Sequence, residues 1–174
     1  HALGDLAARW QEDVIDLRPD VLSVFVGTND AERHLGRLLR ADDPKTVPDF
    51  DFADWERTYR GLLDQARQAN PALKIVLCTP FAAPCGKIVE GALGEYYPLR
   101  QRILAQCCVI VERIAADYGA TLVPFHRLIA DLETRLPNGD ATYWVWDGIH
   151  PTPAGQRLMA DCWIGAAARN GVME

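Results

Sequence analysis

Two short polar segments carry the residue types that hydrolysis through an oxygen nucleophile needs, and the first is a loop with an acid and a histidine. Asp147 precedes His150 by three positions. Gly148 allows a tight bend and Pro151 disfavours helical geometry at His150, so one loop can present both side chains. In such a pair the imidazole moves a proton and the carboxylate fixes its tautomer. The spacing predicts a general base, although an Asp-capped turn with an exposed histidine has the same pattern.

The second segment is Gly27-Thr28-Asn29-Asp30, which follows an apolar run. The side-chain amide of Asn29 can donate a hydrogen bond to charge that develops on a carbonyl oxygen. One such donor lowers a reaction barrier by roughly 3 kcal/mol. An Asx turn between a strand and a loop is the structural alternative. The presence of both segments in one chain favours the catalytic interpretation of each.

No nucleophile is evident beside these groups. The chain contains a single serine, Ser23, inside the apolar run Val21–Val26. This run predicts a buried strand, so we expect the serine hydroxyl to be a hydrogen-bonded core group. Thr28 is predicted to be a turn residue. Cys85, on a long loop, is the thiol whose exposure and pKa would decide a nucleophilic role.

The sequence gives weaker evidence for a functional role of two tryptophans and two further histidines. Trp144 and Trp146 precede Asp147 in an alternating aromatic run. Such rings form platforms for sugar rings or acyl chains, but they also dominate core packing. His34 and His126 are predicted to be surface or helix-end groups without a partner.

The elements that would position these residues alternate between helix and strand. Apolar residues at helical spacing predict a helix over 5–17, which Pro19 ends before the strand Val21–Val26. Two more apolar runs predict strands, Ile75–Thr79 and Thr121–Val123. Further helices are predicted from Asp51 or Asp54 to about 66, over 99–118, from 125 to about 136, and after a cap at Thr152-Pro153. Long loops are predicted over 31–51, with a short helical piece near 35–39, and over 81–97, and a turn over 137–140.

This alternation predicts one α/β domain over residues 1–174, a three-layer αβα structure around a parallel sheet. Right-handed crossovers would make this a doubly wound sheet, in which ligands bind beyond the carboxyl ends of the strands. Both polar segments are expected on that side of the sheet. A hydrophobic content of 49% in 174 residues supplies one ordinary core.

Charge and cysteine usage exclude several classes of function. A net charge of −6 disfavours nucleic-acid partners, and no apolar run reaches the ~18 residues of a membrane span. The five cysteines have no metal-ligand spacing, so we expect reduced, mostly buried thiols, no metal and no cofactor. Reduced thiols favour a cytoplasmic location.

The motifs resemble those of the SGNH (GDSL-type) hydrolase family. Gly27–Asp30, Thr79-Pro80 and Asp147–Thr152 followed by Gly155 are similar to its conserved sequence blocks, and the resemblance covers essentially the whole chain. It implies a flavodoxin-like parallel sheet. It also implies that Asn29 is an oxyanion-hole donor and that Asp147 and His150 complete a triad with a serine.

The resemblance also implies blocks that are not in this chain. The Gly-Asp-Ser block of the family and its second-block glycine should both precede Asn29. Only 28 residues precede Asn29 in this chain, and neither block is among them. We therefore expect an N-terminally incomplete domain whose nucleophile lies upstream of His1, in one or two βα units of about 30 to 60 residues. The strand Val21–Val26 would then be an exposed apolar edge, so we expect self-association or an upstream segment that covers it.

The implied function is serine-dependent hydrolysis of a small-molecule ester through an acyl-enzyme. The activity would be that of a carbohydrate O-acetyl esterase or a lysophospholipase-like enzyme. A second hypothesis is an enzyme of the same family that acts on lipids or thioesters. The chain as it stands is predicted to lack efficient esterase activity. The alternative is a non-catalytic ligand-binding protein that keeps the fold, in which binding survives Asn29→Ala and His150→Ala. A nucleotide binder is disfavoured because no Gly-rich phosphate loop follows a strand.

Overall fold

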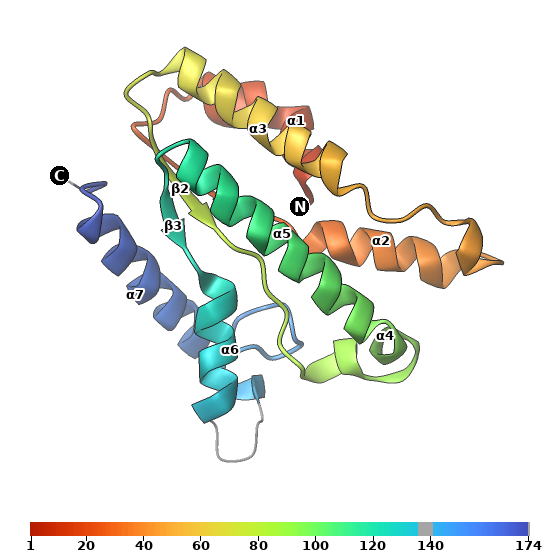
Figure 1. Cartoon of the computed structure of the whole chain (residues 1–174). Helices are drawn as coiled ribbons and strands as arrows, with labels where there is room; N and C mark the ends of the chain where they lie inside the picture. The colour runs from red at the N-terminus through yellow and green to blue at the C-terminus, as the bar shows by residue number, and fades with distance from the viewer. Residues whose placement is uncertain (136–140, 174) are drawn as a thin grey trace.

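A parallel β-sheet lies at the centre of the protein, in a computed structural model that describes residues 1–135 and 141–173 (Figure 1). Within these residues the sheet has three strands in the order β1 (Val21–Phe25), β2 (Lys74–Cys78) and β3 (Thr121–Val123). Both neighbouring pairs are parallel, and Ser23 of β1 is in register with Val76 of β2. The predicted α/β class with a parallel sheet is confirmed.

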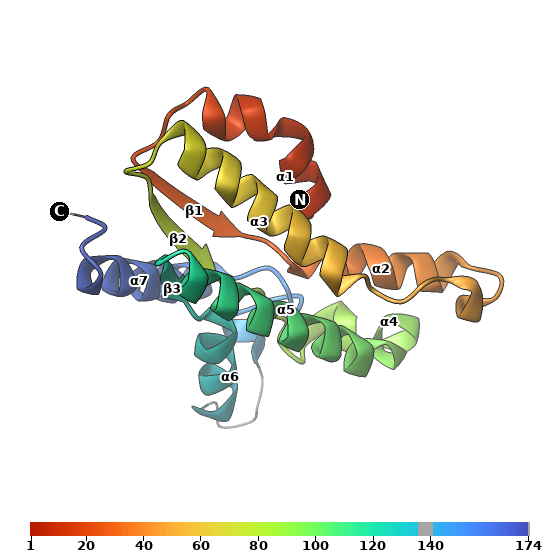
Figure 2. The same ribbon diagram turned by 45° about the horizontal axis from the view of Figure 1, so that its top comes forward.

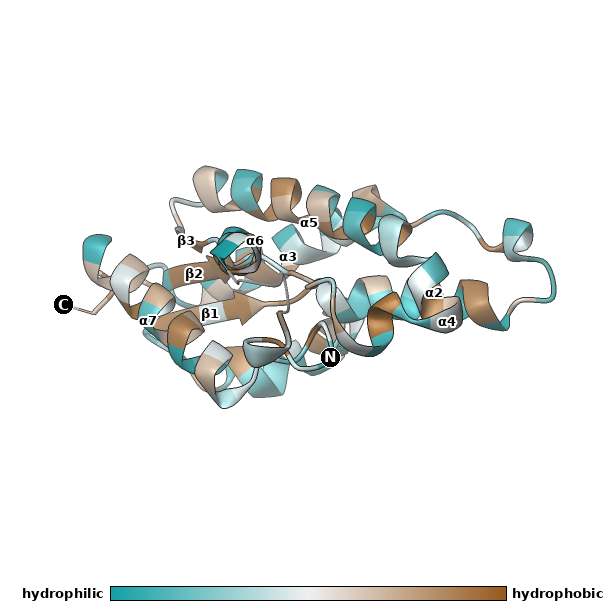
Figure 3. Cartoon of the chain, turned by 90° about the horizontal axis from the view of Figure 1, so that it is seen from below, coloured by the Kyte–Doolittle hydropathy of each residue, from teal (hydrophilic) through white to brown (hydrophobic). Residues whose placement is uncertain are grey.

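Helices cover both faces of this sheet. They are α1 (Leu3–Trp10), α2 (Thr28–Arg40), α3 (Phe52–Ala69), α4 (Gly91–Glu95), α5 (Tyr97–Asp117), α6 (Phe125–Arg135) and α7 (Pro153–Arg169). Short 3₁₀ turns lie at Pro44–Thr46, Gly86–Val89 and Ala141–Tyr143, and a π-helical turn over Gln11–Ile15 extends α1. Helices α3 and α5 pack together, α1 packs on α3, and α7 contacts β3. Figure 3 shows α5 and α7 on opposite sides of the strands.

The predicted helix starts at Asp51 and Thr152 are confirmed. The Asp51 carboxylate accepts a hydrogen bond from the backbone N–H of Asp54 at 2.9 Å. The Thr152 hydroxyl accepts one from Gly155 at 3.2 Å. Each side chain satisfies a backbone donor that the first helical turn leaves without a partner.

The loop predicted over 31–51 is wrong for most of its first ten residues, which are helical well beyond the short piece predicted near 35–39. They belong to α2, which begins directly after β1 and extends away from the sheet (Figure 2). The helix buries a stripe at helical spacing, made of Ala31, His34, Leu35 and Leu38. Burial of that stripe against α5 outweighs the polar and charged composition that favoured a loop.

Two further predictions need correction. The segment 81–97 is not a bare loop, because it contains the 3₁₀ turn Gly86–Val89 and the helix α4. Strand β1 is buried on one face only, since Leu22 and Val24 are buried while Val21, Ser23 and Phe25 are exposed. The predicted turn over 137–140 lies outside the described residues.

The core consists of two clusters, one on each face of the sheet. Ile75 and Leu77 of β2 join the cluster formed with α1, α3 and α5. Val76 and Cys78 join the second cluster, with residues of α6 and α7. The alternation follows from the two-residue period of a strand. Among the described helices, none is long and apolar enough to cross a membrane.

Candidate active site

The segment between Trp144 and Thr152 forms a tight loop that holds the predicted acid and histidine. The backbone N–H of Trp146 donates to the carbonyl of His150 at 3.1 Å, and that of Thr152 donates to the carbonyl of Trp144 at 2.9 Å. Gly148 at the tip has a φ of +92°, in the left-handed region. A Cβ atom there would lie 2.4 Å from the Ile88 side chain, so the position requires glycine.

Asp147 and His150 form the hydrogen-bonded pair that hydrolysis through a general base requires. His150 Nδ1 lies 2.7 Å from Asp147 Oδ2. Asp147 Oδ1 accepts from the backbone N–H groups of Ile149 at 3.1 Å and His150 at 2.8 Å. Both carboxylate oxygens are therefore engaged, and the imidazole is held by its Nδ1 atom.

The charge state of Asp147 follows from these bonds. Partial burial acts to raise the pKa of Asp147, but the hydrogen bonds from the His150 ring and from the two backbone N–H groups outweigh it and hold the pKa below its usual range. An ionised carboxylate is an acceptor only, so His150 Nδ1 carries the proton of this bond. This bond leaves Nε2 as the ring nitrogen that can accept a proton from a nucleophile.

Asn29 lies at the same cavity as His150. Gly27, with a φ of +129°, precedes the first turn of α2 and directs the chain from β1 into the helix. Asn29 and His150 both line a cavity of about 320 Å³, together with Gly27, Thr28 and Ile149. The Asn29 amide donates to the carbonyl of His1 at 3.2 Å and is exposed. The cavity therefore contains an amide donor and a proton acceptor.

Asp30, next to Asn29, is a structural anchor. Its carboxylate oxygens accept from the backbone N–H of Leu3 at 3.0 and 3.2 Å, at the start of α1. Burial raises the pKa of this carboxyl group, and the Leu3 bond opposes the shift. Asp30 thus ties α1 to α2 beside the cavity.

A second layer of contacts supports the Asp147–His150 loop, and sequence reasoning did not find it. The backbone N–H of Ala83 donates to the carbonyl of Gly148 at 2.8 Å. Arg100 of α5 is fully buried, donates to the carbonyl of Ile88 at 3.2 Å, and pairs with Glu32 of α2 at 2.5 Å. Arg100 thereby connects α2, which carries Asn29, to the segment that touches Gly148.

The three alternative nucleophiles are all engaged elsewhere. Ser23 is exposed, contrary to the prediction, and its hydroxyl accepts from Trp163 Nε1 at 3.0 Å. The Thr28 hydroxyl donates to the carbonyl of Phe81 at 3.0 Å. Cys85 is buried and its thiol donates to the carbonyl of Val145 at 2.9 Å.

The two tryptophans have different surroundings. Trp146 is 60% exposed, and its ring centroid lies 6.1 Å from that of His150. Trp144 is half-buried and packs against the second core cluster. Trp146 is therefore the ring that a substrate at His150 would meet first.

The predictions for the other histidines are each wrong in one respect. His34 is not on the surface but buried on the inner stripe of α2, where its ring centroid lies 5.8 Å from that of Phe50. His126 lies at the start of α6, as predicted, but it has a partner, since its Nδ1 atom lies 2.7 Å from the Thr79 hydroxyl oxygen. Across residues 1–135 and 141–173, no group of three His, Cys, Asp or Glu side chains is placed to hold a metal ion.

A parallel sheet with an Asp–His pair and an asparagine at its carboxyl edge defines an α/β protein whose polar site lies where such folds bind ligands. Residues 2–158 match the model of the GDSL-like lipase/acylhydrolase family. The chain belongs to this family.

Similar proteins agree with this assignment. The chain is 32% identical over 167 residues to an acetylxylan esterase of Geobacillus stearothermophilus, a match that covers 94% of this chain and 66% of that protein. It therefore spans just under two thirds of the length of this curated relative. A crystal structure of a GDSL-like protein from Parabacteroides merdae is 27% identical with a TM-score of 0.79, covering 97% of this chain and 69% of the other.

Several crystal structures of the Geobacillus esterase are also similar. The unmodified enzyme is 26% identical with a TM-score of 0.73, covering 95% of this chain and 67% of the other. Variants in which a serine or a histidine is replaced by alanine are described as catalytic mutants. In another variant, a tryptophan four positions before that histidine is replaced by isoleucine.

Proposed function

We propose that the protein hydrolyses esters through an acyl-enzyme, with Asp147, His150 and Asn29 in the catalytic machinery. The observation that carries the proposal is the 2.7 Å contact between His150 Nδ1 and Asp147 Oδ2, at the cavity that Asn29 also lines. A pair held in this way leaves the imidazole with one free nitrogen for proton transfer. Membership of the lipase/acylhydrolase family supports the same reaction.

His150 transfers protons in the reaction, and Asn29 stabilises negative charge. His150 Nε2 takes the proton of a serine hydroxyl while the serine oxygen bonds to the ester carbonyl carbon. Asn29 donates to the carbonyl oxygen, where negative charge develops. His150 then gives the proton to the alkoxide as the ester C–O bond breaks, and the alcohol leaves. A water molecule then attacks the acyl-serine while His150 takes one of its protons. His150 returns that proton to the serine oxygen as the acyl C–O bond breaks, and the carboxylic acid leaves.

The serine of this scheme is proposed to lie in the part of the protein upstream of His1. Ser23 is the single serine of the chain, and its hydroxyl is bonded to Trp163 rather than directed at His150. Thr28 lines the cavity, but its hydroxyl donates to a backbone carbonyl. The catalytic serine mutant of the Geobacillus esterase supports a serine nucleophile.

The proposed substrate is an O-acetyl group on a carbohydrate. The acetylxylan esterase relative supports this class of substrate. Trp146 supports it too, because its exposed ring beside His150 offers a flat apolar face of the kind on which sugar rings stack. Trp146 also lies four positions before His150, the spacing between the substituted tryptophan and histidine of that esterase.

The test is a rate comparison in the longest natural form of the protein. Asp147→Asn should lower kcat for a small acetyl ester by about 10³-fold or more, because the amide no longer holds His150 in the correct tautomer. Asp161→Asn is the matched control, since Asp161 is an exposed acid on α7 that pairs with Arg157. Its rate should equal that of the unmodified protein.

The variant Trp146→Ile tests the proposed carbohydrate substrate separately from the ester-hydrolysis reaction. It should raise KM for acetylated xylo-oligosaccharides while leaving the rate on p-nitrophenyl acetate within about threefold, because a small ester does not need the platform.

Equal rates for Asp147→Asn and Asp161→Asn would contradict the proposed reaction. Ligand binding without turnover, unaffected by Asn29→Ala and His150→Ala, would instead identify a non-catalytic binding protein.

A further inference from the structure

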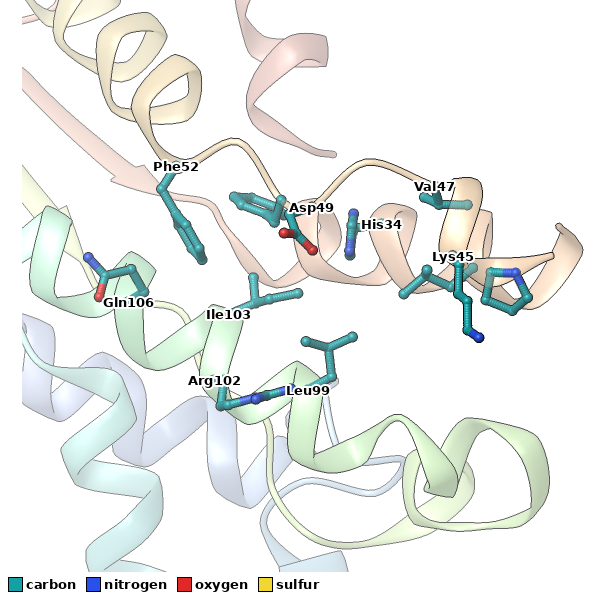
Figure 4. Close-up of a pocket in the computed structure, with 12 residues that line it drawn as sticks. His34, Lys45, Val47, Asp49, Phe52, Leu99, Arg102, Ile103 and Gln106 are labelled. Atoms are coloured by element: carbon teal, nitrogen blue, oxygen red, sulfur yellow. The ribbon is translucent and has the colours of Figure 1, made fainter.

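A second, larger cavity lies between α2, α5 and the segment that leads into α3 (Figure 4). Its volume is about 970 Å³. Phe50, Phe52 and Ile103 supply apolar surface, and Lys45 and Arg102 are charged side chains in its lining. Neither the reaction proposed above nor the family motifs use these residues.

This cavity is separate from the one at His150. The two have no lining residue in common. Both touch α2, but Asn29 lines the first and His34 lines the second. Five residues of an α-helix correspond to about 7.5 Å of rise and a rotation of roughly 140°, so these side chains leave α2 in different directions.

His34 provides a buried polar atom that lacks a partner. The residue is 3% exposed, and its Nδ1 atom has no hydrogen-bond partner in the described part of the chain. Burial and the nearby charge of Arg37 lower the pKa of His34, so the ring is neutral. A neutral imidazole is both a donor and an acceptor. A neutral ring adds no charge to the cavity wall, so the charged side chains of the lining determine which ligands the cavity favours.

The charges around the cavity are unbalanced. Arg102 comes from α5, while Lys45 lies across the opening on the 3₁₀ turn (Figure 4). Neither side chain forms an ion pair with another described residue, whereas most arginines of the chain do so. Asp49, beside His34, is the one carboxylate in the lining. The lining therefore combines an apolar surface with two cations and one anion, which gives it a net positive charge.

We propose that this cavity binds a small carboxylate with an apolar body. The guanidinium of Arg102 pairs with the carboxylate, since its planar fork matches carboxylate geometry, and Lys45 adds a second positive charge at the opening. The body of the ligand packs on Phe50, Phe52 and Ile103. Binding here does not depend on the proposed ester hydrolysis.

The experiment is calorimetric titration of the longest natural form of the protein with 3-phenylpropionate. The ligand should bind, and 3-phenylpropanamide, which has the same body without the charge, should bind at least about tenfold more weakly. Arg102→Gln and Lys45→Gln should each weaken 3-phenylpropionate binding by about threefold to tenfold. Both residues are exposed, so these variants should fold.

Two controls keep the result specific. Arg169→Gln removes an exposed cation at the end of α7 that does not line this cavity, so it should leave binding unchanged. His150→Ala should also leave it unchanged, because His150 belongs to the other cavity. No binding at millimolar concentration, equal affinity for the acid and the amide, or loss of binding in His150→Ala would each overturn the proposal. None of these outcomes depends on whether the protein hydrolyses esters.

Discussion

Asp147 determines the state of His150, because its carboxylate engages the imidazole and the backbone of the same loop. Three hydrogen bonds converge on this one side chain. They favour the ionised carboxylate, which lowers its pKa in the folded protein relative to the unfolded chain. The carboxylate that stabilises a protonated His150 during the reaction is thus ionised and in position before substrate binds.

A pH-dependent effect on stability follows from that shift. The folded-state pKa of Asp147 lies below the unfolded value near 4, so its contribution is fully present above about pH 4 and is lost as the pH falls through the folded-state pKa. Urea unfolding should therefore show a difference between the unmodified protein and Asp147→Asn that shrinks as the pH is lowered from about 5 to below about 4. A difference that grows with acidity would contradict the assigned direction.

Gly148 is the residue on which the shape of the loop depends. Gly148→Ala should lower the free energy of unfolding by about 2 kcal/mol or more, because it adds a left-handed alanine and a clash with Ile88. Gly61→Ala is the matched control, since Gly61 lies within α3 and a Cβ there meets nothing within 4 Å. That change should be neutral or stabilising by up to about 1 kcal/mol. Equal effects of the two changes in thermal unfolding would refute this explanation.

At the scale of single residues, the sequence predicts what is local. Asp147 and His150 are three positions apart, and the caps at Asp51 and Thr152 act within one helical turn, so their contacts follow from spacing. Arg100 and Glu32 are 68 positions apart. Their pairing depends on how α2 and α5 pack, which no local pattern encodes.

At the scale of elements, Arg100 holds α2, α5 and the segment 81–97 in one arrangement. Arg100→Ala should destabilise the protein by about 3–5 kcal/mol, because it leaves Glu32 without its partner beside a buried helix contact. Arg57→Ala is the control, since Arg57 pairs with Asp54 on the exposed surface of α3 and should cost at most about 1 kcal/mol. Chemical denaturation measures the free energy of unfolding of both variants. Comparable losses would show that burial of the Arg100–Glu32 pair does not increase its contribution to stability.

Helix α2 shows why one element was predicted only in part. Its residues are mostly charged and polar, so its composition is that of a loop, although its buried stripe repeats at helical spacing. The other long helices are less polar, and they were predicted within a few residues. What identifies the full length of α2 is tertiary, namely the burial of its inner stripe where α2 packs on α5.

At the scale of the whole molecule, the sheet has an open side. Within the described residues β1 is an edge strand, and Val21 and Phe25 on its outer face are 36% and 46% exposed. The alternation of helix and strand predicts the parallel sheet itself. One-sided burial of β1 was not predictable, because it depends on what packs beside the strand rather than on its own apolar residues.

This edge predicts self-association of residues 1–174 when they are produced alone. Unpaired backbone groups next to apolar side chains favour pairing with another chain. Sedimentation velocity should therefore show association that increases with concentration, and Val21→Lys should reduce it. Leu39→Lys is the control, since Leu39 is equally exposed at 37% but lies on α2. A monomer at every concentration would contradict this prediction.

The central claim is that His150 activates a serine for acyl transfer, and covalent labelling tests it most directly. The longest natural form of the protein would be treated with a fluorophosphonate, and the labelled residue located by mass spectrometry. We predict one adduct, on a serine upstream of His1, that His150→Ala abolishes. An adduct on Ser23, or labelling that persists in His150→Ala, would contradict the claim.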